Sequence, residues 1–261
     1  MTWFPPLRSV LSVLCTVVGR ASHAAALGIG GAALVLPLML GTVAALAQAP
    51  PTSRAPDTME ARLLACAPCH GRQGEGTSND YFPRLAGKPA GYLKNQLVAF
   101  RDGRRRYPPM NYLLEYQSDP YLQKIAEYFA ALRPSPLQQA ATDVSAAVLG
   151  RGKTLVTGGD QAHGVPACSG CHGPKLTGME PAIPGLVGLR ASYVSAQLGA
   201  FRYGTRTTAA PDCMQLVAAN LSEADVTAAA AYLASLPIPP DPSPVAKGAL
   251  AMPFACGSEP N

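Results

Sequence analysis

The chain has 261 residues, of which 48% are hydrophobic and 14% charged, and its formal net charge at pH 7 is +5. Soluble proteins carry about 25% charged residues, so this apolar balance excludes a disordered chain, and the small excess of positive charge does not by itself indicate nucleic-acid binding. The 26 prolines and 25 glycines follow no Gly-X-Y period, which excludes collagen and predicts short elements joined by long loops.

The N-terminal segment has the features of a secretory signal peptide. Arg8 and Arg20 are its only formal charges, residues 24–47 are apolar and small, and the segment ends in Ala45-Leu46-Ala47. A positive start, an apolar stretch and an A-x-A end together predict export and cleavage after Ala47. Residues 24–47 are also long enough to cross a bilayer, so a retained membrane anchor is the alternative.

Two copies of the motif C-x-x-C-H, at residues 66–70 and 168–172, dominate the remaining chain. This motif is typical of c-type haem attachment. Two thiols three positions apart on one helical turn can bond both vinyl-derived carbons of a porphyrin, and the histidine that follows ligates the iron. A zinc site or a redox-active dithiol is the alternative, but zinc needs more ligands, and His163 is the one further histidine outside the leader.

The sequence therefore predicts two covalently bound haem c groups. The attachment and proximal residues are Cys66, Cys69 and His70 for the first haem and Cys168, Cys171 and His172 for the second.

An internal repeat surrounds the two motifs. The segment P-x-L-x-G at 83–87 recurs at 184–188, an offset of 101 residues. The same offset aligns Tyr92 with Tyr193, Gln96 with Gln197, Phe100 with Phe201 and Arg105 with Arg206. The offset then becomes 104, and it aligns Met110 with Met214 and Ser118 with Ser222. Such self-similarity indicates two homologous domains.

The repeat and the proline positions set the expected boundaries. After the leader, residues 1–47, we expect a first domain over 55–133, a linker over 134–143, a second domain over 144–237 and a proline-rich tail over 238–261. Pro134 ends a helix and polar residues follow it, which is typical of a linker.

Each domain is expected to be helical. A short helix precedes or carries each C-x-x-C-H motif, and a middle helix is predicted over 90–101 and again over 191–202, where Leu93, Leu97 and Phe100 recur at helical spacing. No window alternates in the manner of a strand, so the fold class is all-α.

The terminal helices carry start and stop signals. The first is expected to begin at Ser118–Pro120 and the second at Ser222, where Ser222-x-x-Asp225 resembles a capping box. Pro134 and Pro237 follow the two helices and prevent their continuation.

Methionine is the expected second axial ligand of each iron, because His/Met ligation suits electron transfer. Met110 and Met214 are the only methionines that the repeat aligns with each other, and both lie in loops ahead of the terminal helices. A core methionine is the alternative role. Cys213, next to Met214, is a competing ligand for the second iron, and His163 is expected to be a loop histidine.

Together these motifs resemble the dihaem cytochrome c4 family over residues 58–237. The resemblance rests on the paired C-x-x-C-H motifs, the P-x-L-x-G segment, the Y-(x)3-Q-L-(x)2-F-R-x-G-x-R helix and a methionine before a Ser-capped helix. It implies two class-I cytochrome c folds related by a pseudo-twofold axis and a bacterial, periplasmic electron carrier. It also implies that Pro83 and Pro184 offer carbonyls that orient His70 and His172.

The expected function is that of an electron carrier rather than an enzyme, because two His/Met haems leave no open iron position. Expected partners are periplasmic or membrane-bound redox proteins, namely an oxidase, a bc1-type complex or a dehydrogenase; nucleic acid is not a partner, and the membrane is one only if the leader is retained. Two alternatives remain: a dedicated cytochrome subunit of a periplasmic dehydrogenase or thiosulfate-oxidising system, which the tail favours, and a haem enzyme with Cys213 as ligand.

Two further features have predicted roles. Outside the leader, which contains Cys15, only Cys213 and Cys256 remain after haem attachment, and in an oxidising compartment we expect a disulfide that ties the tail over the distal side of the second haem. Four arginines, interrupted by Asp102, form either a solvated loop or a docking patch for an acidic partner. These are Arg101, Arg104, Arg105 and Arg106.

Overall fold

The computed structural model describes residues 56–79, 81–135 and 143–259. The predicted leader, 1–47, and most of the predicted linker lie outside the described residues. Both repeats belong to one structural unit, Ala55–Asn261. Within the described ranges, no helix combines the length and the apolar character needed to cross a membrane.

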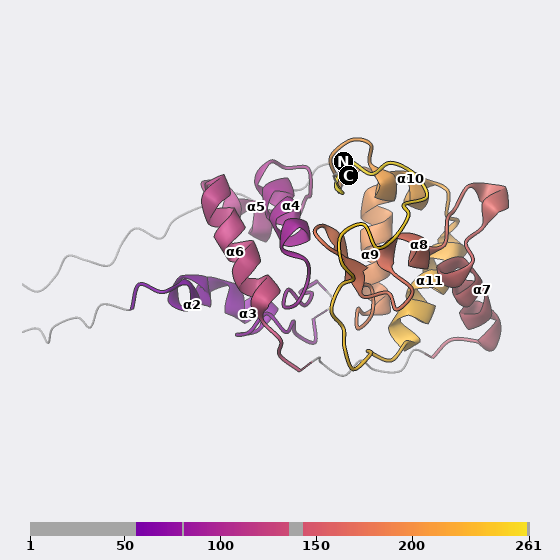
Figure 1. Ribbon diagram of the computed structural model, residues 1–261, viewed down its shortest axis with the longest axis horizontal. Coiled ribbons are helices and arrows are strands. Elements are labelled where there is room, and N and C mark those ends of the chain that lie inside the picture. Colours follow the sequence, from indigo (N-terminus) through magenta and orange to yellow (C-terminus); the bar gives the residue numbers. More distant parts are fainter. Residues whose placement is uncertain (1–55, 80, 136–142, 260–261) are drawn as a thin grey trace, which may run out of the picture. The chain divides into compact units, whose positions relative to one another are not determined.

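The first repeat is built from helices (Figure 1) that surround one apolar cluster. They are α2 (Met59–Arg62), the 3-10 helix η2 (Leu63–Cys66), α3 (Ala67–His70), α4 (Ala90–Arg101), α5 (Pro108–Leu114) and α6 (Asp119–Ala131). The bounds of α4 confirm the prediction, and Ser118 lies at the N-cap of α6, with proline in the first turn. Helix α4 packs against α6. The buried cluster between the helices consists of Leu63, Leu93, Phe100, Leu114, Leu122, Ile125, Ala126 and Phe129.

The second repeat has a similar order of helices, with a pair of short strands added between α8 and α9. Its elements are α7 (Ala146–Thr157), the 3-10 helix η3 (Gln161–His163), α8 (Cys168–His172), β1 (Gly178–Met179), β2 (Ile183–Pro184), α9 (Ala191–Arg202), α10 (Cys213–Ala219) and α11 (Glu223–Ser235). The Ser222–Asp225 capping box is present, and α9 has the predicted bounds. The buried cluster consists of Leu155, Val156, Val165, Leu176, Val194, Leu221, Ala229, Ala230 and Leu233.

Two local expectations differ from the structure. Strands β1 and β2 form a two-stranded antiparallel pair, in which Gly178 lies opposite Pro184; each has only two residues, too few to produce an alternating pattern. The predicted loops around Met110 and Met214 are the short helices α5 and α10. The fold remains all-α in its architecture.

The tail packs back onto the second repeat (Figure 1, yellow). Val245 exchanges backbone hydrogen bonds with the strand pair, accepting from Glu180 N–H and donating to the Gly178 carbonyl, both at 2.9 Å. Farther along, Cys256 forms the predicted disulfide with Cys213, over a sequence separation of 43. By loop entropy, such a link stabilises the fold by roughly 3–4 kcal/mol.

Helices α7 and α11 make the closest packing in the second repeat at Gly152. A Cβ atom added to Gly152 would lie 2.7 Å from Cβ of Tyr232 and closer still to the carbonyl oxygen of Ala228. Both atoms belong to the rigid framework of α11, so neither can move aside. The absence of a side chain at Gly152 therefore sets the distance between these helices.

We predict that Gly152→Ala lowers the free energy of unfolding by about 3 kcal/mol, because overpacking a rigid contact displaces helix α7. Gly150→Ala is a matched control on the same helix, since a Cβ there has no neighbour within 4 Å. This control should raise stability by about 0.5–1 kcal/mol. Denaturant unfolding of the haem-loaded protein measures both values, and equal effects at the two positions would contradict this account of the helix contact.

Candidate haem sites

The second C-x-x-C-H motif lies in a largely apolar cavity. Helix α8 carries both cysteines and His172, and it begins and ends within the motif. The lining of this cavity brings together five residues predicted for the second haem, namely Cys168, Cys171, His172, Pro184 and Met214. Met214 reaches the cavity from helix α10. Attachment, proximal and distal residues thus face one space.

The burial and the hydrogen bond of His172 suit an iron ligand. Its side chain is buried, and its Nδ1 donates a hydrogen bond to the carbonyl oxygen of Pro184 at 2.7 Å. This bond leaves Nε2 as the nitrogen with a free lone pair. Burial lowers the pKa of His172, although the bond to Pro184 opposes that shift, and the imidazole is therefore neutral at neutral pH, as an iron ligand must be.

The first C-x-x-C-H motif repeats this geometry. His70 is buried at the end of α3, and its Nδ1 donates to the carbonyl oxygen of Pro83 at 2.9 Å. Cys66 and Met110 both pack against the apolar cluster of the first repeat, Cys66 from η2 and Met110 from α5. The structure thus shows the His70–Pro83 bond and places Met110 on the same core.

Burial acts on the sulfurs of both motifs. It raises the pKa of Cys66 and Cys171, and it raises the pKa of Cys168 to about 11. A reactive dithiol has a lowered pKa, so these shifts argue against the redox-active dithiol that the motif alone allows.

His163 and Met179 take no part in either site. His163 was expected in a loop, but it is the last residue of the 3-10 helix η3; its side chain is 70% exposed, and its Nδ1 lies 3.0 Å from a carboxylate oxygen of Asp160. Met179 is 2% exposed within strand β1 and serves as a core residue.

Between the domains, Arg105 and Arg206 lie side by side in an antiparallel backbone bridge. Each guanidinium lies over the phenylalanine of its own repeat, Arg105 over Phe100 at 4.5 Å and Arg206 over Phe201 at 4.4 Å. Arg105 donates hydrogen bonds to Gln96 Oε1 at 3.0 Å, to Gln197 Oε1 at 2.7 Å and to the Tyr193 hydroxyl at 3.2 Å. Arg206 donates hydrogen bonds to Gln197 Oε1 at 2.8 Å, to Gln96 Oε1 at 2.8 Å and to the Tyr92 hydroxyl at 3.2 Å. The offset of 101 residues converts the partners of Arg105 into the partners of Arg206, as a pseudo-twofold relation between the domains requires.

This arginine pair has no anionic partner among the described residues: neither guanidinium forms an ion pair with a carboxylate there. Arg206 is only 6% exposed, and its Nε is buried without a hydrogen-bond partner. Burial alone would raise the pKa of Tyr92, but the charges of Arg206, Arg105 and Lys88 outweigh it and lower that pKa to about 8. A positive field of this kind suits a carboxylate-bearing group, and haem carries two carboxylates.

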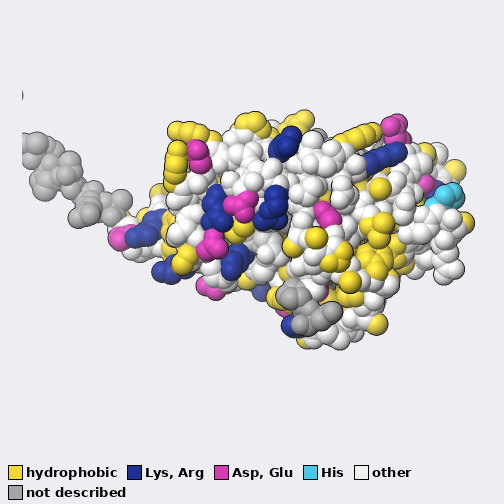
Figure 2. All heavy atoms as spheres, turned by 90° about the horizontal axis from the view of Figure 1, so that it is seen from above, with side chains coloured by type: hydrophobic (Ala, Val, Ile, Leu, Met, Phe, Trp, Pro, Cys, Tyr) yellow, Lys and Arg dark blue, Asp and Glu magenta, His cyan; other side chains and the backbone are white. Residues whose placement is uncertain are grey.

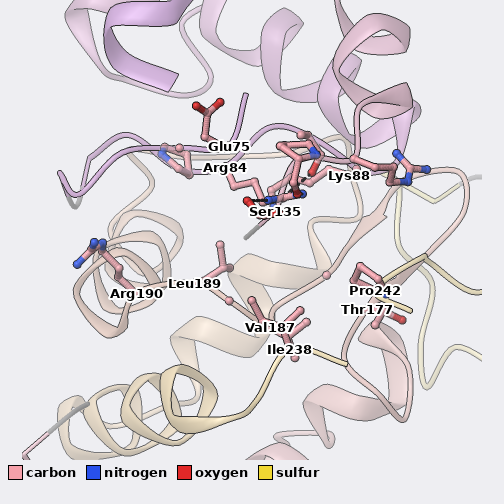
Figure 3. A pocket seen from close by; sticks show the side chains of 18 of the residues that line it. Glu75, Arg84, Lys88, Ser135, Thr177, Val187, Leu189, Arg190, Ile238 and Pro242 are labelled. Carbon is pink, nitrogen blue, oxygen red and sulfur yellow. Dashed lines mark hydrogen bonds between the residues drawn. The ribbon is translucent and has the colours of Figure 1, made fainter. Parts of the chain in front are cut away.

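Lys88 is the third positive charge that lowers the pKa of Tyr92, and it also lines a second cavity. It lines both the haem cavity of the second repeat and a cleft between the repeats. Figure 3 shows Arg84 and Ser135 on one side of this cleft and Val187 and Ile238 across from them. Arg84 donates to the carbonyl oxygens of Pro134 (2.8 Å) and Ser135 (3.4 Å). Arg84 therefore fixes the beginning of the linker.

The docking-patch hypothesis for the arginine cluster is wrong for its central member. Arg105 bonds across the domain interface, and Arg101 pairs with Asp102 and Asp119. Arg104 lies 3.6 Å from the same Asp102. On the face shown in Figure 2, Lys and Arg side chains are interspersed with Asp and Glu rather than joined into one basic surface. The sequence did contain the signal for this interface, because the tyrosine, glutamine and arginine of each network recur at one offset.

Comparisons with known proteins agree with the geometry. The cytochrome c family model matches residues 150–237. A cytochrome c4 of Pseudomonas aeruginosa is 39% identical over 179 residues, which cover 68% of this chain and 86% of the relative. A protein of Thiomonas intermedia named thiosulfate dehydrogenase electron acceptor is 36% identical over 210 residues, covering 80% of this chain and 95% of the relative.

Solved structures give the same result. Reduced cytochrome c4 from Pseudomonas stutzeri superposes with a TM-score of 0.59 at 33% identity and covers 68% of this chain and 96% of that chain. A thiosulfate dehydrogenase from Marichromatium purpuratum gives a TM-score of 0.60 at 35% identity and covers 66% of this chain but 36% of that chain. This chain thus spans about a third of the latter structure.

The similarities cover both repeats with their two attachment motifs, and they settle the class of the protein. It carries two covalently bound haem c groups in tandem class-I cytochrome c domains, it transfers electrons, and its partners are other redox proteins. The chain belongs to the dihaem cytochrome c4 family.

Proposed function

We propose that the protein is a periplasmic electron relay in which each iron has one histidine and one methionine ligand. The ligand pairs are His70 with Met110 and His172 with Met214. One observation carries this proposal: a single apolar cavity is lined by both cysteines of the second motif, by His172 and by Met214. The repeat extends the assignment to the first haem, because Met110 is the counterpart of Met214 and packs on the same core as Cys66.

The bound haem supplies an iron that gains and loses one electron without a change of ligands. The chain's own residues hold the ligands still and exclude water. Pro83 and Pro184 fix the two imidazole rings through their carbonyls, as partners of metal-binding histidines commonly do. If Met110 and Met214 bind the two irons, no iron position is open to a substrate, and this would support a carrier and not a catalyst.

The arginine pair would hold the haem carboxylates. Two guanidinium groups lie side by side between the domains without an anionic partner among the described residues, and Nε of Arg206 has an unused donor. Haem carboxylates that face the interface would supply the missing negative charge. Arg105 and Arg206 would then join the two domains and position both haems at one polar centre.

We further propose that the electron donor is a periplasmic thiosulfate dehydrogenase. The relative named as the electron acceptor of such an enzyme aligns with 80% of this chain, whereas the cytochrome c4 of P. aeruginosa aligns with 68%. The chemistry fits two haems, because coupling two thiosulfate ions into tetrathionate releases two electrons. The second candidate, supported by the cytochrome c4 relatives, is a general carrier between a bc1-type complex or another dehydrogenase and an oxidase.

The proposed location follows from the leader. Residues 1–47 would direct export and be removed, which leaves domains over 55–133 and 144–237, a linker over 134–143 and the tail over 238–261 in the periplasm. The Cys213–Cys256 disulfide supports this location, since such bonds persist in oxidising compartments.

Replacement of the methionine ligands tests the iron assignments. We expect Met110→Ala and Met214→Ala each to remove about half of the weak methionine–iron absorption at the red end of the visible spectrum, because each deletes one of two such bonds, and each to lower the reduction potential of one haem. Met179→Leu is the matched control, since Met179 is equally apolar but lies in the core. Full retention of the absorption in either alanine variant would disprove that ligand.

Reduction kinetics test the donor. The oxidised holoprotein, mixed with thiosulfate and a thiosulfate dehydrogenase, should become fully reduced, with both haems taking up electrons; thiosulfate alone should leave it oxidised, because the protein is a carrier. Stopped-flow absorbance follows the reaction. No reduction by this pair, together with rapid reduction by a bc1-type complex and quinol, would favour the general carrier instead.

A further inference from the structure

We propose that the C-terminal tail forms a third wall of the second haem site through Met252 and Phe254. This wall keeps water from the second iron and raises that haem's reduction potential above the value its own domain would give. The inference rests on the proposed ligation by Met214, and it assigns the tail a role that has no counterpart in the first repeat.

The tail has the geometry of a wall. Between 251 and 256 the side chains alternate: Ala251, Pro253 and Ala255 are exposed, while Met252 and Phe254 are half-buried and Cys256 is buried. Every second side chain of this segment is thus turned away from solvent. The inward set lines the same cavity as His172 and Met214.

Contacts of Cys256 and Gly257 fix the C-terminal end of this wall. The disulfide attaches Cys256 to Cys213, which begins helix α10 and precedes Met214 in the sequence. The backbone N–H of Gly257 donates to the Pro211 carbonyl at 2.9 Å. A Cβ at Gly257 would lie 2.5 Å from the carbonyl oxygen of Ala209, so the tail and this loop touch backbone to backbone.

Buried polar contacts extend the attachment to both domains. Glu259 is 6% exposed, and its carboxylate accepts a hydrogen bond from the Ala182 backbone N–H at 3.1 Å. The amide of Asn95, on helix α4 of the first repeat, donates to the Ser258 carbonyl at 3.4 Å. Tyr92, Asn95 and Gln96 of α4 line the cavity as well. The second haem is thus enclosed by its own domain, by α4 and by the tail.

Exclusion of water from a haem changes its reduction potential in a known direction. The oxidised iron centre carries one more positive charge than the reduced one, and a charge is stabilised less where water is excluded. Burial by Met252 and Phe254 therefore favours the reduced second haem and raises its potential. The same side chains obstruct external ligands that would displace Met214.

Phe254→Ala and Met252→Ala in the holoprotein test the proposal, with Pro253→Ala as an outward-facing control on the same segment. A redox titration should show a lower potential for the second haem and an unchanged first haem in both inward variants. Imidazole should bind the oxidised second haem faster in them than in the wild type. The control should match the wild type in both measurements.

A further variant, Cys213→Ser with Cys256→Ser, releases the anchor and should shift the second potential in the same direction. Unchanged potentials and imidazole rates in both inward variants would overturn the wall. If Met252→Ala removes the methionine–iron absorption of the second haem and Met214→Ala does not, Met252 is the ligand and the proposal fails. Retention of that absorption in Phe254→Ala shows that a shift in potential reflects the wall and not loss of the ligand.

Discussion

The contact between Arg105 and Arg206 is the interaction on which the arrangement of the two domains depends. Two positively charged guanidinium groups side by side repel each other. Here two glutamines and two tyrosines accept their hydrogen bonds, and two phenylalanine rings pack against them. Each of these three pairs has one member from each repeat. Backbone bonds on either side close the joint, from Arg106 N–H to Thr205 and from Thr207 N–H to Arg104. In our proposal, haem carboxylates relieve this repulsion, and haem binding and domain pairing then reinforce each other.

The two haem sites have matching attachment motifs, yet their surroundings differ. His70 and His172 have the same carbonyl bond and the same burial. The second site has further walls, because α4 crosses from the first domain and the tail returns through the Cys213–Cys256 disulfide. In our account, the tail raises the potential of the second haem above the value that its own domain would give.

Local patterns in the sequence predicted local structure well. The middle helices and the Ser222 capping box follow from spacing and capping rules that act within one turn, and both are found. The short helix α5 was expected to be a loop because of its prolines, yet proline suits the first turn of a helix. Its counterpart in the second repeat, α10, has Asp212 at its N-cap, and the side chain of Asp212 accepts a hydrogen bond from Gln215 N–H.

Features that depend on distant residues were harder to predict. Arg105 looked like part of a surface charge cluster because two of its partners, Tyr193 and Gln197, lie in the other repeat, 88 and 92 positions away in the sequence. The methionine ligands follow from the repeat alone, and their assignment to the irons remains a prediction.

A redox titration of the double variant Arg105→Gln with Arg206→Gln tests the central claim most directly. Arg206 is buried and Arg105 is half-buried; if haem carboxylates lie next to this pair, loss of the two positive charges destabilises the reduced irons, and both potentials should fall. Arg101→Gln with Arg106→Gln removes the same charge from the end of α4 and the loop that follows it, and it should change the potentials little. Equal, small shifts in the two variants would show that Arg105 and Arg206 do not act on the haems.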